Sequence, residues 1–336
     1  MRYLCFYIIV LSELLISSLR GLTVGQDTYV YVMDLIPQLK SVNYVEILRG
    51  NLWFAKRDPF CYCFLKFIST PFANYTTYFF ILESIYWILI ADTMKRYSKD
   101  PLLTLFVFIS FRFSFFNMSA IRQSIALAIS VFSYRYYVAG KSIKYLICIL
   151  FASLFHFSAI VSLLLLLVGK FTLINKRWLV YIIAVAFVAF SYMLSTYFGL
   201  AFIEHSEFAY SNYIAKNTGG GNYFSVLFIL LLFVLINLFL SNNRNIEKRI
   251  DMVKAYNILT IAFLMSMAGF FVSLIFRASM YFSYLVPIIY SNALVGIKPK
   301  SKYNQWLMIG LFCMLGIYIF TGVIEAYVPY KFYWEK

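Results

Sequence analysis

Long apolar runs, separated by short polar breaks, follow one another along almost the whole chain. A helix that crosses a bilayer needs about 20 mostly apolar residues. The pattern therefore predicts an all-α, polytopic integral membrane protein with a single transmembrane domain over residues 1–336 and about eleven transmembrane helices. Two of the runs are short and form either two spans or one bent hairpin. The predicted spans are residues 3–19, 75–93, 101–117, 118–138, 144–156, 157–169, 178–199, 223–241, 255–275, 278–296 and 305–322.

The composition supports this class of protein. Apolar residues make up 62% of the chain and charged residues only 13%, whereas soluble proteins average roughly 45–50% and 25%. Too few polar side chains are present to cover a surface that faces water. This argues against a cytoplasmic enzyme, a nucleic-acid-binding protein and a disulfide-stapled secreted domain. The formal charge of +15 is therefore interpreted as a topology signal.

Most basic residues fall on one side of the predicted spans. Seventeen of the 29 are Arg2 and the basic residues in the breaks at 95–99, 135–144, 170–177, 244–254 and 298–302. By the positive-inside rule this side is the cytoplasm, so the N-terminus lies inside and the C-terminus outside. Residues 3–18 resemble a signal peptide, but no small-residue cleavage site follows them, and we expect an uncleaved first span.

Three longer segments lie on the opposite, outer side, over residues 20–74, 199–222 and 322–336. Within the first of them, Pro59–Phe72 is amphipathic, and we expect it to lie in the membrane interface. Because the outer connections are long and the inner ones short, any chemistry is expected at the outer face.

Several cationic side chains and one imidazole stand inside the spans or at their outer rim: Arg20, Arg112, Arg122, Arg277 and His156. Burying a guanidinium group in lipid costs several kcal/mol, so these side chains should face an internal cavity. From the turn near Gly140, the fourth span reaches Arg122 after about 27 Å of helical rise, and the fifth reaches His156 after about 24 Å. The two side chains are therefore expected at a similar depth near the outer face.

Plainer explanations exist for such residues. A rim arginine can extend to lipid phosphates, which is the favoured explanation for Arg112 taken alone, and a histidine at a helix end can be an ordinary polar residue. Glu13 and Glu83, in the middle of spans, are expected to form structural salt bridges or to stay protonated.

The five cysteines, with Cys61 and Cys63 two positions apart, form no disulfide framework, and we expect no metal or redox role for them.

Five short stretches, in order along nearly the whole chain, match the motifs of a known family. They are RGLTVGQDTYVY at 20–31, NMSAIRQSIA at 117–126, LFASLFHFSA at 150–159, RASMYF at 277–282 and VPYK at 328–331. The ordered set resembles the EpsG/Wzy-like O-antigen (polysaccharide) polymerase family. No matching motif stands between about residues 160 and 270, so the role of that segment, including acceptor recognition, stays open.

The resemblance implies an O-antigen polymerase of the bacterial inner membrane, similar in fold to multi-span glycosyltransferases that use lipid-phosphate sugars. Such enzymes join oligosaccharide repeat units, carried on undecaprenyl diphosphate, at the periplasmic face. The implied partners are these lipid-linked oligosaccharides, membrane lipids and a chain-length regulator protein, with no nucleic acid.

The residues fit this chemistry. Transfer leaves negative charge on the lipid diphosphate, and the sequence holds neither a nucleotide-binding loop nor a metal cluster. We therefore expect a metal-independent enzyme without a cofactor, in which arginine side chains neutralise the leaving group. Arg122 and Arg277 are assigned to the diphosphate, with Arg20 as a helper. Further substrate-binding candidates are Arg112, Gln123, Ser158 and Tyr281.

The identity of the base is left open by the sequence. His156 can accept the proton of the acceptor hydroxyl as a general base, or it can donate a hydrogen bond to the leaving diphosphate. Asp27, in the first outer segment, is the competing base, ahead of Glu204 and Glu207.

Two other functions compete with the polymerase. A flippase for lipid-linked oligosaccharides needs a cationic cavity open to both faces, often with transporter repeats, whereas these arginines gather near one face. A membrane-bound acyltransferase also places arginine and histidine in multi-span helices, but its acyl donor would enter from the cytoplasmic side.

Overall fold

The computed structural model is all-helical over the residues that it describes, which are 1–25, 27–52, 54–56, 58–171, 173, 177–193, 250–269, 273–296, 306, 310 and 330–335. The chain divides into two compact units, residues 1–160 with 309–336 and residues 161–308. The predicted span 223–241, most of the predicted span 305–322 and the predicted outer loop 199–222 lie outside the described residues.

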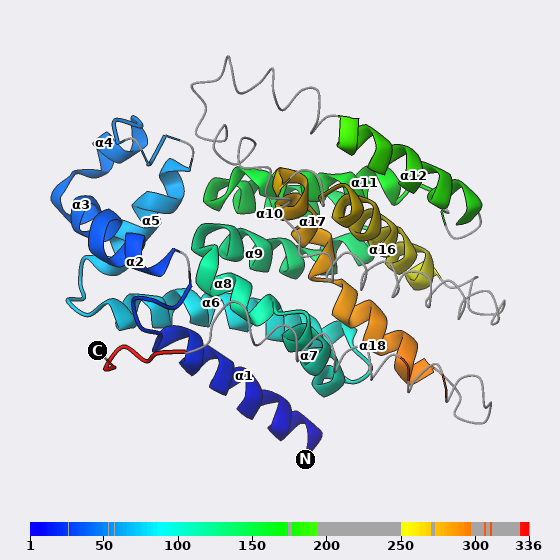
Figure 1. Ribbon diagram of the computed structural model, residues 1–336, viewed down its shortest axis with the longest axis horizontal. Helices are drawn as coiled ribbons and strands as arrows, with labels where there is room; N and C mark the ends of the chain where they lie inside the picture. Colours follow the sequence, from blue (N-terminus) through cyan, green and yellow to red (C-terminus); the bar gives the residue numbers. More distant parts are fainter. Residues whose placement is uncertain are drawn as a thin grey trace. The chain divides into compact units, whose positions relative to one another are not determined.

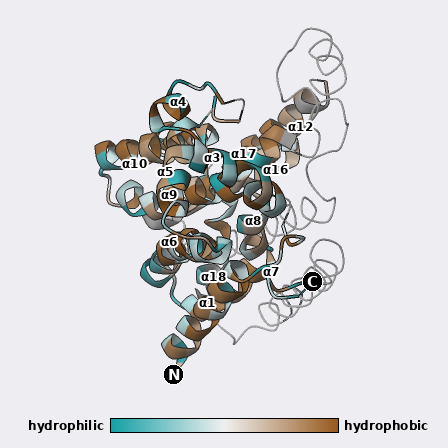
Figure 2. Ribbon diagram, turned by 90° about the vertical axis from the view of Figure 1, so that its left-hand side faces the viewer, coloured by the Kyte–Doolittle hydropathy of each residue, from teal (hydrophilic) through white to brown (hydrophobic). Residues whose placement is uncertain are grey.

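A helical bundle forms the first unit, with α6 (Tyr75–Tyr97) at its centre. On one side α6 packs against α1 (Arg2–Ser18) and on another against α9 (Ile121–Val138), which in turn packs against α10 (Ser142–Phe155). The large side chains of Tyr86 and Trp87 on α6 are fully buried. Apolar residues predominate along α1 and α10 (Figure 2). This is the pattern of helices that bury their contacts on one side and meet lipid on the other.

Four short helices of the first outer segment form a cap at one end of this bundle (Figure 1). They are α2 (Thr28–Val30), α3 (Ile36–Ser41), α4 (Tyr44–Leu48) and α5 (Pro59–Ser69), and a π-helical turn, Tyr31–Leu35, joins α2 to α3. Pro59 begins α5, where its missing N–H costs no hydrogen bond. The predicted amphipathic stretch 59–72 thus contains a helix, and it packs against α3, α4, α6 and α10.

Contacts at the other end of the bundle bring together the start of α1, the end of α6 and the end of α9. Arg2 forms a salt bridge with Asp100 at 3.1 Å, the Lys95 ammonium lies 5.5 Å from the Tyr7 ring centroid, and Arg135 pairs with Asp92. All three of these basic residues belong to the set predicted to face the cytoplasm. The chain turns back from α9 to α10 at Gly140, whose φ of +69° suits a residue without a side chain.

The predicted span 101–117 contains a sharp bend. Here α7 (Pro101–Ser110) and α8 (Phe113–Ser119) meet at 54°. Arg112, expected at the end of that span, lies in the break and has a left-handed backbone with φ +60°. The next helix begins at Ile121 and not at residue 118, because Ala120 leaves the helical conformation and separates α8 from α9.

The second unit is organised around α16 (Ile250–Gly269). It packs against α12 (Arg177–Met193) and α17 (Ser273–Ser283), and more lightly against α11 (Leu164–Val168) and α18 (Val286–Gly296). The Asn257 amide donates hydrogen bonds to the carbonyls of Val168 at 3.0 Å and Phe171 at 2.9 Å, which ties the end of α11 to α16. A 3₁₀ helix, Phe157–Leu163, precedes α11.

In the part of the chain that the structure describes, fewer helices are long enough to cross a membrane than the eleven spans that the sequence predicts. Within the described residues α6 alone is long and apolar enough to cross a membrane, and the number rises to three if each of two bent pairs forms one span. One such pair is α7 with α8, and the other comprises Leu274–Ser283 and Val286–Asn292. Five other apolar helices in the described part of the chain are shorter, among them α10, which ends at Phe155 before His156. The fold class is confirmed as all-helical, and the eleven spans stay a prediction.

Candidate active site

Asp58 connects the ends of three helices in the first unit. It precedes α5, and its carboxylate makes no capping hydrogen bond to that helix. Its Oδ2 atom instead accepts a hydrogen bond from Nη1 of Arg122 at 2.7 Å and lies 3.3 Å from Nδ1 of His156. Its Oδ1 atom accepts from the backbone N–H of Phe157 at 3.2 Å. Asp58, Arg122 and His156 are called the Asp58 cluster below.

Within the Asp58 cluster the carboxylate is buried, whereas its two side-chain partners are partly exposed to solvent. The side chain of Asp58 is 3% exposed, whereas that of His156 is 16% and that of Arg122 is 28% exposed. Apart from Nη1, the guanidinium nitrogens of Arg122 make no hydrogen bond to the part of the chain that is described. Arg122 therefore retains donors for a further anion while one of its nitrogens is held by Asp58.

Aromatic side chains of the cap surround the Arg122 guanidinium. Its central carbon lies 5.1 Å from the centroid of the Tyr62 ring, a cation–π contact that limits its movement. The Tyr31 hydroxyl is buried and has no hydrogen-bond partner among the described residues. Burial raises the pKa of Tyr31 well above its ordinary value, and the nearby Arg122 charge opposes that shift. The phenol thus stays protonated and remains a hydrogen-bond donor beside Arg122.

Asp27 holds the start of α9, the helix that carries Arg122. Its Oδ2 accepts a hydrogen bond from the backbone N–H of Ile121 at 3.3 Å, one of the N–H groups that a helix leaves unpaired at its first turn. The loop before it approaches closely: a Cβ atom on Gly25, which has φ +80°, would lie 2.2 Å from the Met118 carbonyl oxygen. Asp27 and Gly25 therefore help to fix where α9 begins, one residue before Arg122.

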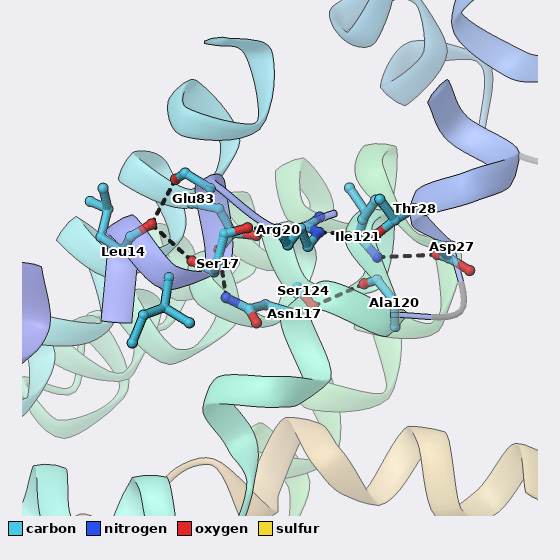
Figure 3. A network of polar contacts seen from close by, with 12 residues as sticks. Leu14, Ser17, Arg20, Asp27, Thr28, Glu83, Asn117, Ala120, Ile121 and Ser124 are labelled. Carbon is cyan, nitrogen blue, oxygen red and sulfur yellow. Dashed lines mark hydrogen bonds and ion pairs between the residues drawn. The ribbon is translucent and has the colours of Figure 1, made fainter. Parts of the chain in front are cut away.

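A second set of polar contacts surrounds Arg20 and is called the Arg20 cluster (Figure 3). Nη1 of Arg20 forms a salt bridge with Glu83 at 2.8 Å, its Nε donates to the Thr28 hydroxyl at 2.9 Å, and its guanidinium lies 4.0 Å from the Phe79 ring centroid. The Asn117 amide donates to the other carboxylate oxygen of Glu83. The side chains of Arg20 and Glu83 are 0% and 5% exposed. The salt bridge considered for Glu83 is thus present, and its partner is Arg20.

Residues near the C-terminus form backbone hydrogen bonds with the segment around Arg20. The backbone N–H of Gly21 donates to the Lys331 carbonyl at 2.8 Å, and that of Tyr333 donates to the Leu19 carbonyl at 3.0 Å. Arg20 and Phe332 form an isolated antiparallel bridge. A Cβ atom on Gly21 would lie 3.0 Å from the Lys331 oxygen, so the strand-like contact requires a small residue there. The VPYK stretch thus ends in a segment that closes the Arg20 cluster.

The remaining predicted site residues are distributed over both units. Arg112 lies in the break between α7 and α8, Gln123 is buried one residue after Arg122, and Ser158 is partly buried in the 3₁₀ helix after His156. Arg277, partly exposed, and Tyr281, buried, lie on α17 of the second unit. The structure brings Arg122 and His156 together through Asp58 and gives Arg20 a separate, closed environment; the substrate roles of all these residues stay predictions.

Asp58 is the central residue that sequence reasoning missed. Its only signal is its place directly before Pro59, at the start of the amphipathic stretch in the outer segment. That pattern ordinarily marks a helix N-cap. The pairing with Arg122 and His156, 64 and 98 positions away, depends on the packing of α5 against α10.

The side chains gathered around Asp58 are of the kinds that bind an anion. Among the described residues no group of three or more histidine, cysteine, aspartate or glutamate side chains is placed to hold a metal ion. The Asp58 cluster offers a guanidinium group and an imidazole, and the Tyr31 phenol lies near that guanidinium. These are groups that bind phosphate oxygens and accept or donate a proton.

A family model described as the EpsG family matches residues 3–332 of the chain. Comparisons with curated proteins and with solved structures gave no match. The matched range includes every residue of the Asp58 and Arg20 clusters.

Proposed function

The chain belongs to the EpsG family, and we propose that it is an O-antigen polymerase that joins undecaprenyl-diphosphate-linked oligosaccharide repeat units at the periplasmic face of the inner membrane. Membership makes it a membrane protein of the polymerase-type glycosyltransferase class involved in polysaccharide biosynthesis. The proposal adds four points to family membership: the lipid donor, the O-antigen product, the periplasmic site and the eleven spans.

The observation that carries the proposal is the Asp58 cluster. A lipid diphosphate leaving group develops negative charge as its bond to the sugar breaks, and donors placed in advance where that charge appears lower the barrier. Arg122 has donors left over and is partly exposed. Arg277, an arginine of α17, is proposed as the second guanidinium. For Arg20 we propose a structural role in place of the helper role expected from the sequence, because Glu83 pairs with it in a buried site.

The proposed reaction is a single glycosyl transfer. An acceptor hydroxyl on one lipid-linked unit attacks the anomeric carbon of the growing glycan, and a glycosidic C–O bond forms. The bond from that carbon to the diphosphate oxygen breaks, and the diphosphate keeps the electron pair, with Arg122 beside it. The hydroxyl proton passes to Nε2 of His156, which makes no hydrogen bond to a described residue, and then to solvent or the released diphosphate.

The two ends of the bundle support the proposed orientation. Arg2, Lys95 and Arg135 gather at one end, and the cap with the Asp58 cluster lies at the other. If the basic end faces the cytoplasm, the Asp58 cluster faces the periplasm, where lipid-linked repeat units are polymerised. A chain-length regulator is the proposed protein partner at this face.

Reconstitution tests the function directly. Purified protein in vesicles is given a lipid-diphosphate oligosaccharide, with EDTA and without nucleotide, and products are separated by length. A ladder of multiples of the repeat unit is expected. No ladder with the wild-type protein, or a ladder only after a divalent cation is added, would contradict the proposed reaction or its metal independence.

Deletion of the gene in cells separates the competing functions. A polymerase deletion leaves a surface glycan of one repeat unit, a flippase deletion leaves no exported glycan, and an acyltransferase deletion leaves glycan of normal length. In the same cells, Arg122→Ala and Arg277→Ala are each expected to abolish chain extension while the protein still accumulates in the membrane. Normal ladders from both variants would overturn the site assignment.

A further inference from the structure

Asp58 has three partners and nearly no access to solvent. One oxygen contacts both Arg122 and His156, and the other accepts the Phe157 N–H. With the carboxylate 3% exposed, an incoming sugar meets Arg122 and His156 before it meets Asp58. The carboxylate can therefore act on the reaction through its partners, without touching the substrate.

We propose that Asp58 is the positioning residue of the active site: it fixes the tautomer of His156, so that Nε2 faces the acceptor as a base, and holds Arg122 in line for the diphosphate. This inference rests on the proposed function. It assigns a role to a residue outside the five motif stretches, and it favours the base over the donor among the two roles that the sequence left open for His156.

The tautomer follows from the chemistry of the contact. A carboxylate oxygen only accepts hydrogen bonds, so the 3.3 Å contact places a proton on Nδ1 of His156. In a neutral imidazole the other nitrogen, Nε2, then carries the lone pair. The backbone supports this orientation, because the Phe157 N–H binds the same carboxylate and fixes the residue next to His156.

The guanidinium is held by the same carboxylate. The Nη1–Oδ2 distance of 2.7 Å and the Tyr62 ring on one side restrict Arg122 to one orientation. A shared carboxylate keeps the leaving-group donor and the base at a constant separation, and catalytic groups lose effect when they are displaced by about 1 Å. The pairing also lowers the cost of keeping the guanidinium partly buried.

Asp58→Asn tests the tautomer argument. An asparagine amide at this place can donate to Nδ1 of His156, which moves the imidazole proton to Nε2 and removes the base. With the size of the side chain unchanged, we expect kcat to fall about 100-fold or more, whereas KM for the lipid-linked donor does not rise. Asp58→Glu returns a carboxylate and is expected to recover part of the lost kcat.

A double-mutant cycle shows whether Asp58 acts through His156. His156→Asn supplies a donor near Nδ1 and keeps the bond to Asp58, but it has no Nε2 base. In that background Asp58→Asn is expected to cost less than about threefold in kcat, because coupled residues are not additive. Full additivity of the two effects would overturn the inference. The matched control is Asp92→Asn, which removes a carboxylate paired with an arginine at the opposite end of α9 and should leave kcat unchanged.

A chemical probe covers the case in which Asp58→Asn does not accumulate. The chain holds two histidines, His156 and His205, so His205→Gln leaves one imidazole for diethylpyrocarbonate, which attacks an unprotonated ring nitrogen. We expect modification of His156 in the otherwise wild-type protein to abolish activity, and hydroxylamine to restore it. No modification of His156 in active protein would overturn the inference. A wild-type protein that makes no ladder contradicts the proposed function instead, so the two failures are distinguishable.

Discussion

Two arginines in the first unit place the same side chain in two different environments. Arg20 is 0% exposed, and its charge is matched by Glu83, with Thr28 and Ser17 accepting further hydrogen bonds. Arg122 is 28% exposed, and it shares the carboxylate of Asp58 with His156. Both sit near the cap, and both have an aromatic ring beside the guanidinium.

The two arginines differ in whether their hydrogen-bond donors remain accessible to a ligand. The Arg20–Glu83 ion pair is buried and leaves almost no access for a ligand, although Nη2 of Arg20 has no hydrogen-bond partner among the described residues. Arg122 is partly exposed and retains hydrogen-bond donors. We therefore expect the buried, salt-bridged Arg20 to stabilise the fold and the partly exposed Arg122 to bind the substrate. The following predictions test that contrast.

Arg122 is expected to give the largest effect on activity. Arg122→Ala should lower chain extension at least about 100-fold, because a donor at the developing charge is lost, and Arg122→Lys should recover little because an ammonium group offers no planar fork. Ladder length and kcat in reconstituted vesicles measure both. Arg135→Ala, at the far end of the same helix, serves as the control and should extend chains normally. Equal losses in both variants would indicate damage to α9 in general.

Glu83→Gln should chiefly reduce stability. It leaves Arg20 buried without its counter-charge, which typically costs about 3–5 kcal/mol, whereas the joint change Arg20→Met with Glu83→Leu should be much less damaging. The midpoint of chemical unfolding in detergent measures the loss, and activity is expressed per folded molecule. Unchanged stability with abolished activity would reverse the assignment of the two arginines.

Gly25→Ala should disturb the loop that positions α9. The new Cβ would meet the Met118 carbonyl at 2.2 Å, and φ +80° is already unfavourable for alanine. We expect a loss of about 2 kcal/mol or more in the free energy of unfolding. Gly140→Ala is the control: its φ is also positive at +69°, but no atom lies within 4 Å of the new Cβ, so its cost should stay near 1–2 kcal/mol. Equal costs would show that the contact with Met118 is unimportant.

Two neighbouring cysteines should differ in reactivity without any effect on activity. Burial raises the pKa of Cys61 to about 12, so its thiol stays protonated at pH 7 to 9 and should resist maleimide in the folded protein. Cys63, on the same helix, is partly exposed and should be labelled faster. Mass spectrometry after a timed reaction compares the two. Rapid labelling of Cys61 would mean that the packing around Arg122 and Tyr62 opens readily.

Local signals in the sequence anticipated parts of the site. The depth arithmetic from Gly140 placed Arg122 and His156 at one level, and the structure joins both to Asp58. Glu83 was expected as a structural charge, and it is one. Three features were not anticipated: the enclosure of Arg20, the break at Arg112 and the pairing of Asp58 with Arg122 and His156. None of them follows from periodicity, because periodicity reports which face of a helix is apolar and not which helix it meets.

The sequence by itself determined the class of the protein, because a chain with so many apolar and so few charged residues can only be stable where its surface meets lipid or its own helices. It also indicated the basic side and the family motifs. Only the tertiary structure decided how the charges pair. Salt bridges such as Arg20 with Glu83 and Arg122 with Asp58 join residues more than 60 positions apart. Their partners are chosen by the geometry of α5, α6, α9 and α10 in three dimensions, which no local pattern encodes.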